Sequence, residues 1–234
     1  MRINIEKKNI KIFNYNLTFS DLFFLYKQIL SKKSFLRSTH NLFLKKKIDI
    51  KQPVANLGSG KKNDYIKYIY KDDILVKNYD FFKLDKNVTK IDLEKKFTLK
   101  KKFKSIILFN VLEHIYNKEQ LIKSINKNLK KGGKLELFVP FMFRYHGDPK
   151  DYHRITHTYL IKFLRENGFK TEVTLIATGQ ASVILEILLK YLKLSIIKYP
   201  FAILLILVNF IFKFFSKDFN NYYCGIHCSC IKIK

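Results

Sequence analysis

The chain is poor in the residues that staple, break or loosen a protein fold. Its 234 residues include three cysteines, four prolines, eight glycines and no tryptophan. The cysteines, Cys224, Cys228 and Cys230, are odd in number and lie close together, which argues against a disulfide framework and favours a reducing, cytoplasmic compartment. Because 47% of the residues are hydrophobic, the composition excludes a disordered or collagen-like chain and predicts a globular protein with a sizeable core.

The sequence also lacks segments that would carry it into or across a membrane. Residues Met1–Phe13 carry charge throughout, so they contain no apolar core of a secretory signal. The longest run without charge, Tyr199–Phe212, has fourteen residues, whereas a bilayer-spanning helix needs about 20. We therefore expect a cytoplasmic protein without a transmembrane helix.

No metal site is expected from the ligand-type residues near the C-terminus. The spacing of Cys224, His227, Cys228 and Cys230 matches no usual zinc-binding pattern. The isoleucines among these residues favour a β-strand that carries the thiols. We accordingly predict no metal.

Arginine is scarce in a chain that is otherwise strongly basic. Lysine and arginine total 45 against 19 acidic residues, giving a formal net charge of +26, yet only five of the 45 are arginines. Base recognition in nucleic acids favours the planar fork of arginine, and the basic residues here are spread along the whole chain. We interpret the lysines as solvated surface residues and do not expect a nucleic-acid partner.

Residues 1–50 form an N-terminal extension that precedes the main pattern. The partial alternation of Arg2–Leu17 suggests a hairpin. Ser20 is a helix-capping residue type, and the apolar residues of Asp21–Leu30 recur at helical spacing, so a helix is predicted there. Residues 51–234 are assigned to the main domain.

From Pro53 onward, short apolar runs alternate with helical stretches. The predicted strands are Val54–Leu57, Ile74–Tyr79, Val88–Ile91, Ser105–Phe109, Leu135–Val139, Phe169–Ile176 and Cys228–Ile233. Helices are predicted over Lys118–Leu129, which Gly132-Gly133 would stop, and over Tyr159–Asn167. Strands that alternate with helices form parallel βαβ units, so the fold class is α/β with a doubly wound sheet.

The segment 181–215 is helical in pattern but apolar nearly all round. Pro200 divides it into two predicted helices, and lysines such as Lys190 and Lys213 flank its apolar surface. This composition suits a helical hairpin at a membrane interface, with its lysines at anionic head groups, which would place the protein at the inner face of the membrane. The alternative is a pair of helices packed on the sheet or on a second copy of the chain.

In open parallel sheets, ligands bind beyond the carboxyl ends of the strands. Gly58 and Gly60 follow the first predicted strand and permit a sharp turn with close approach to a ligand. Asp80 follows the second strand and is placed to accept both hydroxyls of a ribose, with Asp85 as its rival if that strand is longer. Asp92-Leu93 follows the third strand, where an acceptor and an apolar wall suit an adenine.

Five pieces of the sequence, taken in order, are typical of one enzyme family. They are Asn56-Leu57-Gly58-Ser59-Gly60, Asp80, Asp92-Leu93, Phe109–Ile115 and Leu129-Lys130-Lys131-Gly132-Gly133. Together they resemble the class I S-adenosylmethionine-dependent methyltransferases, particularly the broad small-molecule branch known as type 11. The likeness covers about Val54 to Ile176, over half of the chain.

This resemblance implies a Rossmann-like sheet of seven mainly parallel strands, the last of them antiparallel, and S-adenosylmethionine as cofactor. The cofactor-binding residues that it implies are Gly58, Ser59, Gly60, Asp80, Asp92, Leu93, Asn110, Val111 and Leu112. The glycine loop would lie near the methionine moiety, Asp80 at the ribose, Asp92-Leu93 at the adenine, and Asn110–Leu112 at the edge facing the sulfonium. Glu113-His114 would orient the start of the next helix. Only thirteen residues separate Gly60 from Ile74, so the usual loop and first helix are shortened.

The segment Val139–Thr156, after the fifth predicted strand, resembles a subgroup encoded among glycan-building proteins. It carries His146, Pro149, Asp151-Tyr152 and Arg154 in series. Such a loop would lie over the transferred methyl group, so Asp151, Tyr152 and Arg154 are candidates for acceptor binding.

If the acceptor is a hydroxyl, a base must remove its proton. His146 is our first candidate for that base, because its ordinary pKa is near neutrality, ahead of His153 and Asp151. Alternatively, His146 only fixes the loop. Arg154 would bind an anionic group of the acceptor or would pair with Asp148 or Asp151.

The sequence therefore predicts a methyltransferase that acts on a small-molecule or glycan acceptor, with the segment 181–215 holding it near lipid-linked acceptors. One alternative is a membrane-surface binding protein that keeps the fold without turnover. Another is an RNA methyltransferase, although the chain has no Asn/Asp-Pro-Pro-Tyr-like box after the fourth strand.

Overall fold

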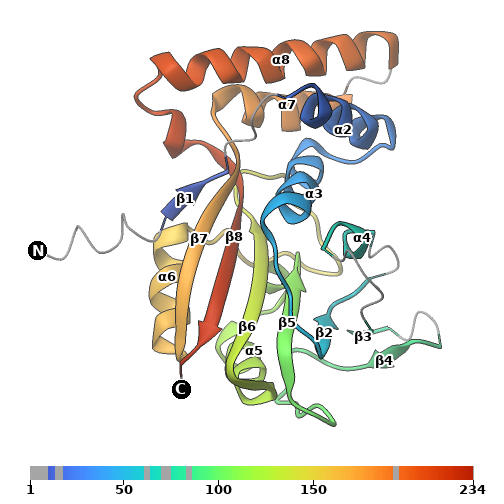
Figure 1. Cartoon of the computed structure of the whole chain (residues 1–234), viewed down its shortest axis with the longest axis vertical. Coiled ribbons are helices and arrows are strands. Elements are labelled where there is room, and N and C mark those ends of the chain that lie inside the picture. The colour runs from blue at the N-terminus through green and yellow to red at the C-terminus, as the bar shows by residue number, and fades with distance from the viewer. Residues whose placement is uncertain are drawn as a thin grey trace, which may run out of the picture.

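Short apolar runs of the chain assemble into one eight-stranded sheet with helices on both faces (Figure 1). The computed structural model describes residues 10–13, 18–60, 64–69, 75–82, 86–191 and 195–233, with the backbone alone for 195–199. In spatial order the strands are β1 (Ile10–Ile12), β7 (Phe169–Thr178), β8 (Tyr223–Lys232), β6 (Leu129–Pro140), β5 (Phe103–Phe109), β2 (Val54–Leu57), β3 (Val76–Asp80) and β4 (Val88–Lys90). Only β8 runs antiparallel to its neighbours among these strands.

The predicted α/β class, the doubly wound sheet and the antiparallel last strand are confirmed. The strand number differs, because β1 adds an eighth strand to the seven expected. Ile10–Ile12 pairs in parallel with Val173–Leu175 at the edge of the sheet. Much of the hairpin suggested for Arg2–Leu17, namely residues 2–9 and 14–17, lies outside the described residues.

The helices are α2 (Phe19–Leu30), α3 (Phe35–Lys47), α4 (Ile66–Ile69), α5 (Lys118–Asn128), α6 (His157–Glu166), α7 (Gln180–Tyr191) and α8 (Ser195–Phe215). Two short 3₁₀ helices, η1 (Leu112–His114) and η2 (Phe219–Asn221), complete the described elements. Helix α4 has four residues, in agreement with the shortened first helix expected from the sequence.

Alternation along the central strands sorts the core into two layers. On β5, Ile106 and Leu108 face the cluster that includes the apolar residues of α5 and α6. The intervening Ile107 and Phe109 face the other cluster, which includes residues of α2, α3, α7 and α8. Two helices of this second layer, α3 and α7, supply residues to the cavity described below.

Helix α2 begins earlier than predicted, and its cap is a different residue. The Thr18 hydroxyl, rather than that of Ser20, accepts a hydrogen bond from the backbone N–H of Asp21 at 3.2 Å. Thr18 precedes Asp21 by three residues, which is the spacing at which a capping side chain reaches a free N–H of the first turn. Ser20 is itself a residue of the first turn.

Helix α3 was not predicted from the sequence. Its centre, Ser38-Thr39-His40-Asn41, is polar, and three lysines follow, so no apolar stripe is visible in the sequence. All four central residues are nevertheless buried. The buried Thr39 hydroxyl donates a hydrogen bond to the carbonyl of Phe35 at 2.9 Å. The Ser34 hydroxyl caps the start of the helix by accepting a hydrogen bond from Arg37 N–H.

The sequence predicted that Pro200 separates two helices, but Pro200 lies inside one helix. It is the sixth residue of α8, which continues to Phe215. A proline removes one backbone hydrogen bond, and near the start of a long helix this loss does not end it. No described helix is long and apolar enough to cross a membrane.

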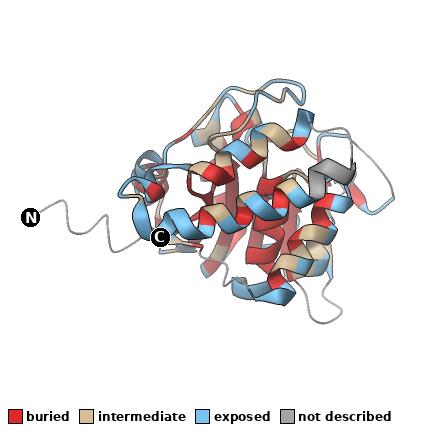
Figure 2. Ribbon diagram, turned by 90° about the horizontal axis from the view of Figure 1, so that it is seen from above, coloured by how far each residue is buried: buried red, intermediate tan, exposed pale blue. Residues whose placement is uncertain are grey.

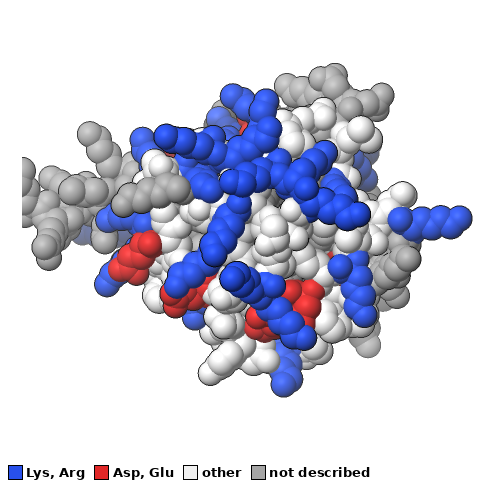
Figure 3. Space-filling model, turned by 90° about the horizontal axis from the view of Figure 1, so that it is seen from below, with Lys and Arg blue, Asp and Glu red and all other residues white. Residues whose placement is uncertain are grey.

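Helices α2, α7 and α8 lie at one end of the sheet, the end toward which β5 points and from which β8 departs (Figure 1). Viewed onto that end, exposed residues line α8 above the buried sheet (Figure 2). The opposite end is dominated by lysine and arginine side chains, with few acidic ones (Figure 3). The end of the molecule opposite these helices is therefore basic.

Candidate functional site

The first part of the site is the turn that follows β2. Gly58 and Gly60 both have left-handed backbone, with φ of +68° and +62°. A Cβ on Gly58 would lie 2.3 Å from Cγ2 of Val111, whereas a Cβ on Gly60 would meet nothing within 4 Å. Glycine is therefore required at Gly58 by both conformation and contact, and at Gly60 by conformation.

The carboxylate of Asp80 closes this turn from the neighbouring strand. Its Oδ2 accepts a hydrogen bond from Gly60 N–H at 2.8 Å, and its Oδ1 accepts one from Phe82 N–H at 3.1 Å. Gly58 N–H donates to the carbonyl of Tyr79 at 2.8 Å. The turn and the end of β3 therefore form one cradle. Asp85, the rival of Asp80, lies outside the described residues.

The cradle has unused hydrogen-bonding capacity. The hydroxyl of Ser59 is buried and finds no hydrogen-bond partner among the described residues. Buried hydroxyls are normally paired, so an orphaned one beside two glycines fits a bound polar ligand. The residues present here therefore suit a nucleoside cofactor of the kind that the sequence suggested.

The other predicted cofactor residues lie on adjacent strand ends. Asn110 follows β5 with left-handed backbone, φ +54°, and its N–H donates to the carbonyl of Phe138. Asp92 follows β4 and accepts from the N–H of Glu94. The side chains of Leu93 and Leu112 are buried in the core, and that of Val111 is buried beside Gly58.

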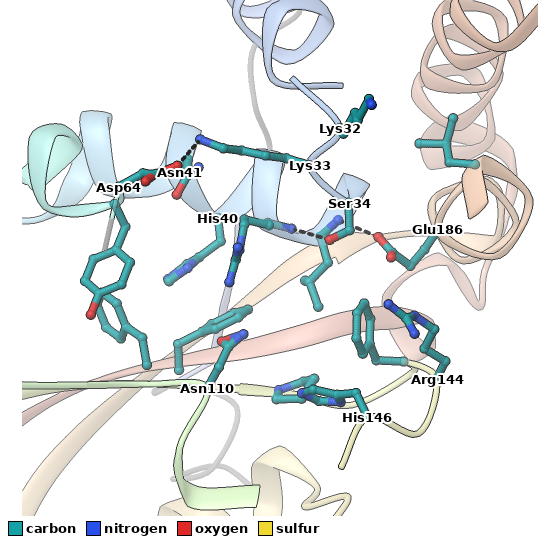
Figure 4. A pocket seen from close by; sticks show the side chains of 18 of the residues that line it. Lys32, Lys33, Ser34, His40, Asn41, Asp64, Asn110, Arg144, His146 and Glu186 are labelled. Carbon is teal, nitrogen blue, oxygen red and sulfur yellow. Dashed lines mark hydrogen bonds and ion pairs between the residues drawn. The ribbon is translucent and has the colours of Figure 1, made fainter. Parts of the chain in front are cut away.

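A cavity of about 850 Å³ opens beside these strand ends (Figure 4). Its walls come from β5, β6 and the loop after it, the segment Ser31–Asn41 that includes most of α3, and α7. Asn110 and His146 are the predicted site residues that line it. The contributions of α3 and α7 were missed, because no motif in the sequence connects those helices to this edge of the sheet.

Cations outnumber anions around the cavity. Its basic lining residues are Lys32, Lys33, Arg37, Arg144 and Lys190, and its acidic ones are Asp64 and Glu186. Lys33 pairs with Asp64 at 3.1 Å. Burial raises the pKa of Glu186 to about 7, and its carboxylate accepts a hydrogen bond from Leu36 N–H. The lining therefore favours a ligand with negative charge.

His146 lies at the junction of the cavity and a cluster of charged side chains. Its Nε2 is 3.6 Å from Oε1 of Glu113, and its Nδ1 is 3.3 Å from Oδ2 of Asp151. The Glu113 carboxylate, and more weakly the charge of Asp151, raise the pKa of His146 above its ordinary value. His146 therefore holds a proton over a wider pH range than a free histidine.

The sequence left open whether Arg154 binds the acceptor or pairs with Asp148 or Asp151, and the structure shows its partners. Its guanidinium binds both oxygens of Asp151 and the carbonyl of Arg144. Burial works against ionisation of Asp151, yet the hydrogen bonds from Arg154 lower its pKa. Arg154 thus pairs with Asp151 rather than Asp148, and Asp151 is tied up rather than free to act as a base.

The remaining loop residues do not line the cavity. The Tyr152 N–H donates to the carbonyl of Glu113, and its ring meets that of Tyr116 edge to face. His153, the second candidate base, has a buried Nε2 without a hydrogen-bond partner among the described residues. Of the three candidate bases, His146 is the one that faces the cavity.

A polar chain runs from the cavity wall into the sheet. His40 of α3 meets His227 of β8 at 3.1 Å between ring nitrogens, and His227 meets Glu136 of β6 at 2.9 Å. All three side chains are buried. Burial, aided by the neighbouring His227, keeps the pKa of His40 well below its ordinary value, so His40 is neutral.

The sequence of residues 35–172 matches a protein family described as a methyltransferase domain. No curated protein sequence matches the chain. Among solved structures, the cyclase SpnF is similar with a TM-score of 0.56 at 12% identity, over 91% of this chain and 93% of the other. A methyltransferase dependent on S-adenosylmethionine, from Archaeoglobus fulgidus, gives a TM-score of 0.53 at 13% identity, over 88% and 94%.

A phosphoethanolamine N-methyltransferase from Haemonchus contortus, solved with phosphomonomethylethanolamine and S-adenosylhomocysteine, is also similar. Its TM-score is 0.54 at 13% identity, over 93% of this chain and 58% of that one. At such identities the structural likeness shows the fold. One of these neighbours is a cyclase, so the fold alone does not define the reaction.

Proposed function

The chain belongs to the methyltransferase-domain family, and from this premise we propose that it transfers a methyl group from S-adenosylmethionine to a small-molecule or glycan acceptor. The observation that carries the proposal is the cradle of Gly58, Gly60 and Asp80. It lies on the same sheet edge as Asn110, which lines the cavity. A cofactor site and an acceptor site are thus adjacent, as group transfer requires.

Each part of the cofactor has a proposed partner. Asp80 receives the ribose hydroxyls, and the backbone of Gly58 and Gly60 passes close to the methionine moiety. Asp92 lies at the adenine, with Leu93 behind it in the core. Asn110 borders the sulfonium. The sulfonium supplies both the electrophilic methyl group and its leaving group, so the protein contributes mainly positioning and exclusion of water.

The acceptor lies in the cavity and approaches from the side of α3, α7 and the loop after β6. His146 acts on the acceptor's proton, because it is the candidate base that faces the cavity. Glu113 and Asp151 hold its ring from two sides. For an amine acceptor already in its neutral form, the same ring accepts a hydrogen bond and orients the nucleophile.

We further propose that the acceptor carries a negatively charged group, such as a phosphate or a carboxylate. The sequence had given this role to Arg154, which is instead occupied by Asp151. Lys32, Arg37 and Arg144 take its place, because they line the cavity from two sides, the segment Ser31–Asn41 and the loop after β6. Tyr152 and Asp151 then support the loop rather than contact the acceptor.

The exposed apolar side chains of α8 fit a peripheral membrane contact. On α8, Leu204, Leu207, Ile211 and Phe214 recur at helical spacing, and each is exposed, Phe214 by 67%. Lys190 of the neighbouring helix α7 lines the cavity. A bilayer beneath α8 would therefore place the cavity close to anionic head groups, where a lipid-linked acceptor is held.

Isothermal titration calorimetry with S-adenosylmethionine tests the central proposal. Binding with a Kd in the micromolar range is expected, and no heat at millimolar cofactor would refute it. Binding without methyl transfer to any anionic acceptor would instead favour the membrane-surface protein that keeps the fold without turnover. Failure to bind RNA at physiological salt would dispose of the RNA methyltransferase.

A further inference from the structure

We propose that Glu113, His114 and His146 form a binding site for one divalent transition-metal ion at the edge of the cavity. The inference goes beyond the proposed methyl transfer, and the role given to the ion below rests on that function. The three residues come from η1 and from the loop after β6, so the fold brings them together across about thirty positions of the sequence.

The geometry of the three side chains suits a single ion. One ligand atom from each lies within 4.8 Å of the others. Oε1 of Glu113 is 3.6 Å from Nε2 of His146 and 3.8 Å from Nε2 of His114. Ligand atoms about 2.0–2.1 Å from a tetrahedral zinc ion lie about 3.3 Å apart. The two distances from Glu113 exceed this by a few tenths of an ångström, and the two imidazole nitrogens lie within 4.8 Å of each other.

The imidazole rings of His114 and His146 are each oriented by an oxygen atom next to Nδ1, on the side away from Glu113. The Nδ1 atom of His114 is 2.6 Å from the carbonyl oxygen of Lys150, so it carries the proton and leaves Nε2 with a free lone pair. The Nδ1 atom of His146 lies 3.3 Å from a carboxylate oxygen of Asp151. A backbone carbonyl or carboxylate behind the ring is the usual support of a metal-binding histidine, since it fixes the ring and the tautomer.

The third ligand is the buried carboxylate of Glu113, which lacks hydrogen bonds within the described part of the chain. The Glu113 side chain is 1% exposed, and neither of its oxygens has a hydrogen-bond partner among the described residues. Burying an ionised carboxylate without hydrogen bonds is costly. An ion held between Glu113 and the two Nε2 atoms would give the carboxylate a closer partner than the imidazoles, which lie 3.6 and 3.8 Å away.

The donor set selects the class of ion and gives it a role. Two imidazole nitrogens and one carboxylate suit Zn²⁺, Mn²⁺ or Fe²⁺ better than Mg²⁺ or Ca²⁺, which prefer oxygen ligands. Because His146 borders the cavity, an open coordination position would face the acceptor. A hydroxyl bound there has a lowered pKa. With Nε2 on the ion and Nδ1 at Asp151, His146 would hold the ion and would not itself take the acceptor's proton. That proton would leave to water as the new O–C bond forms and the cofactor's S–C bond breaks.

The test is metal binding by tag-free, chelator-treated protein, in the absence of cofactor. Calorimetry with ZnCl₂ is expected to give one ion per chain, and Co²⁺ is expected to give the visible absorption bands of a low-coordinate site. Glu113→Gln, His114→Gln and His146→Gln should each weaken binding by about a hundredfold or more. His157→Gln is the matched control, since His157 bonds to Tyr223 away from the cluster, and it should bind as the wild type does.

The outcomes are separable. If Glu113→Gln does not fold, as judged by circular dichroism, the variants of His114 and His146 decide, because these side chains are less buried than Glu113. Absence of binding in the wild type, or binding that survives in all three variants, overturns the site. If the wild type binds no metal ion, an NMR titration of His146 is informative. A lower pKa of His146 in Glu113→Gln than in the wild type would show that Glu113 and His146 form an ion pair instead of a metal site. If the protein binds the cofactor but no metal ion, the proposed function stands and the metal site is refuted. If it binds the metal ion but no cofactor, the proposed function is refuted and the metal site stands.

Discussion

The carboxylate of Asp80 and the backbone N–H of Gly60 are joined by a 2.8 Å hydrogen bond. This contact links the end of β3 to the turn after β2, and the second carboxylate oxygen holds the N–H of Phe82 in the same way. The aspartate that the proposal assigns to the ribose thus also shapes the turn assigned to the methionine moiety. A change at Asp80 is expected to affect both.

Replacing Asp80 with alanine should weaken S-adenosylmethionine binding by about ten- to a hundredfold. A charge-assisted hydrogen bond is worth about 1.5–3 kcal/mol, and the loss includes the organisation of the turn. Calorimetry measures the Kd directly. Glu166→Gln is the control, because that exposed carboxylate lies 4.0 Å from Lys162 on α6, outside the cradle. Equal affinity in Asp80→Ala and wild type would remove Asp80 from the cofactor site.

The two glycines of the turn should respond differently to alanine. In Gly58→Ala the new Cβ would collide with Val111 Cγ2, in addition to the cost of a left-handed backbone. Gly60→Ala carries only the backbone cost, about 1 kcal/mol. Urea denaturation should therefore show a larger loss for Gly58→Ala. Adding Val111→Ala should recover part of that loss, and a strictly additive double variant would contradict the contact.

Replacing His146 with alanine should lower the turnover number by about a hundredfold or more, while the Kd for S-adenosylmethionine stays within about twofold. The expected size is that of a lost group acting on the acceptor's proton. His153→Ala is the matched control, since it is the neighbouring histidine that does not line the cavity. Equal turnover in both variants would mean that His146 only fixes the loop.

The partly buried Glu186 should make the protein less stable as the pH rises. Its pKa is about 7 in the folded protein against 4.5 in the unfolded chain, so the folded state binds the extra proton. The free energy of unfolding therefore falls between about pH 4.5 and 7. Glu186→Gln keeps an acceptor for Leu36 N–H and removes the charge. It should stabilise the protein at pH 8 by on the order of 1–2 kcal/mol, and not at pH 4.5; equal denaturation midpoints at pH 8 would contradict the assignment.

Two charges placed on the outer side of α8 should release the protein from anionic vesicles. Leu207→Glu with Phe214→Glu removes two apolar side chains, each worth about 1.5–3 kcal/mol when buried, and should reduce co-sedimentation with phosphatidylglycerol vesicles at least tenfold. Leu75→Glu is the control, because Leu75 is 86% exposed elsewhere on the surface. Unchanged binding of the α8 variant would mean that α8 packs on protein instead.

The strands were predictable because their signal is local. Val54–Leu57 was predicted with its observed bounds, and the strand ends at Phe109 and Asp80 were located to within a residue. The cradle followed from them, because parallel strands end at one edge and the glycines and aspartate stand directly after their strands. Helix α5 ended at Asn128, earlier than the glycines at 132–133, because Leu129 already turns into β6.

The cavity was not predictable in the same way. Its wall at α3 is a helix whose buried centre is polar, so the apolar periodicity that identifies a buried helix face is absent. Glu186 reaches Leu36 across 150 positions of sequence, and His40 reaches His227 across 187. The same applies to Glu113 and His146, whose separate motifs gave no sign that they meet. Tertiary packing alone brings these pairs together.

His40 lines the cavity and also bonds to His227 inside the sheet, so a substitution at His40 that changes the acceptor also affects the sheet. His40 and His227 share one hydrogen bond, and the other ring nitrogen of His227 bonds to Glu136. A different residue at position 40 of the cavity wall would therefore leave Nδ1 of the buried His227 on β8 without its partner, while Glu136 would keep Ser229 and His227. We therefore expect acceptor preference and the residue at 227 to change in concert as relatives diverge, and a pocket redesigned at His40 to require a matching change at His227, 187 positions away.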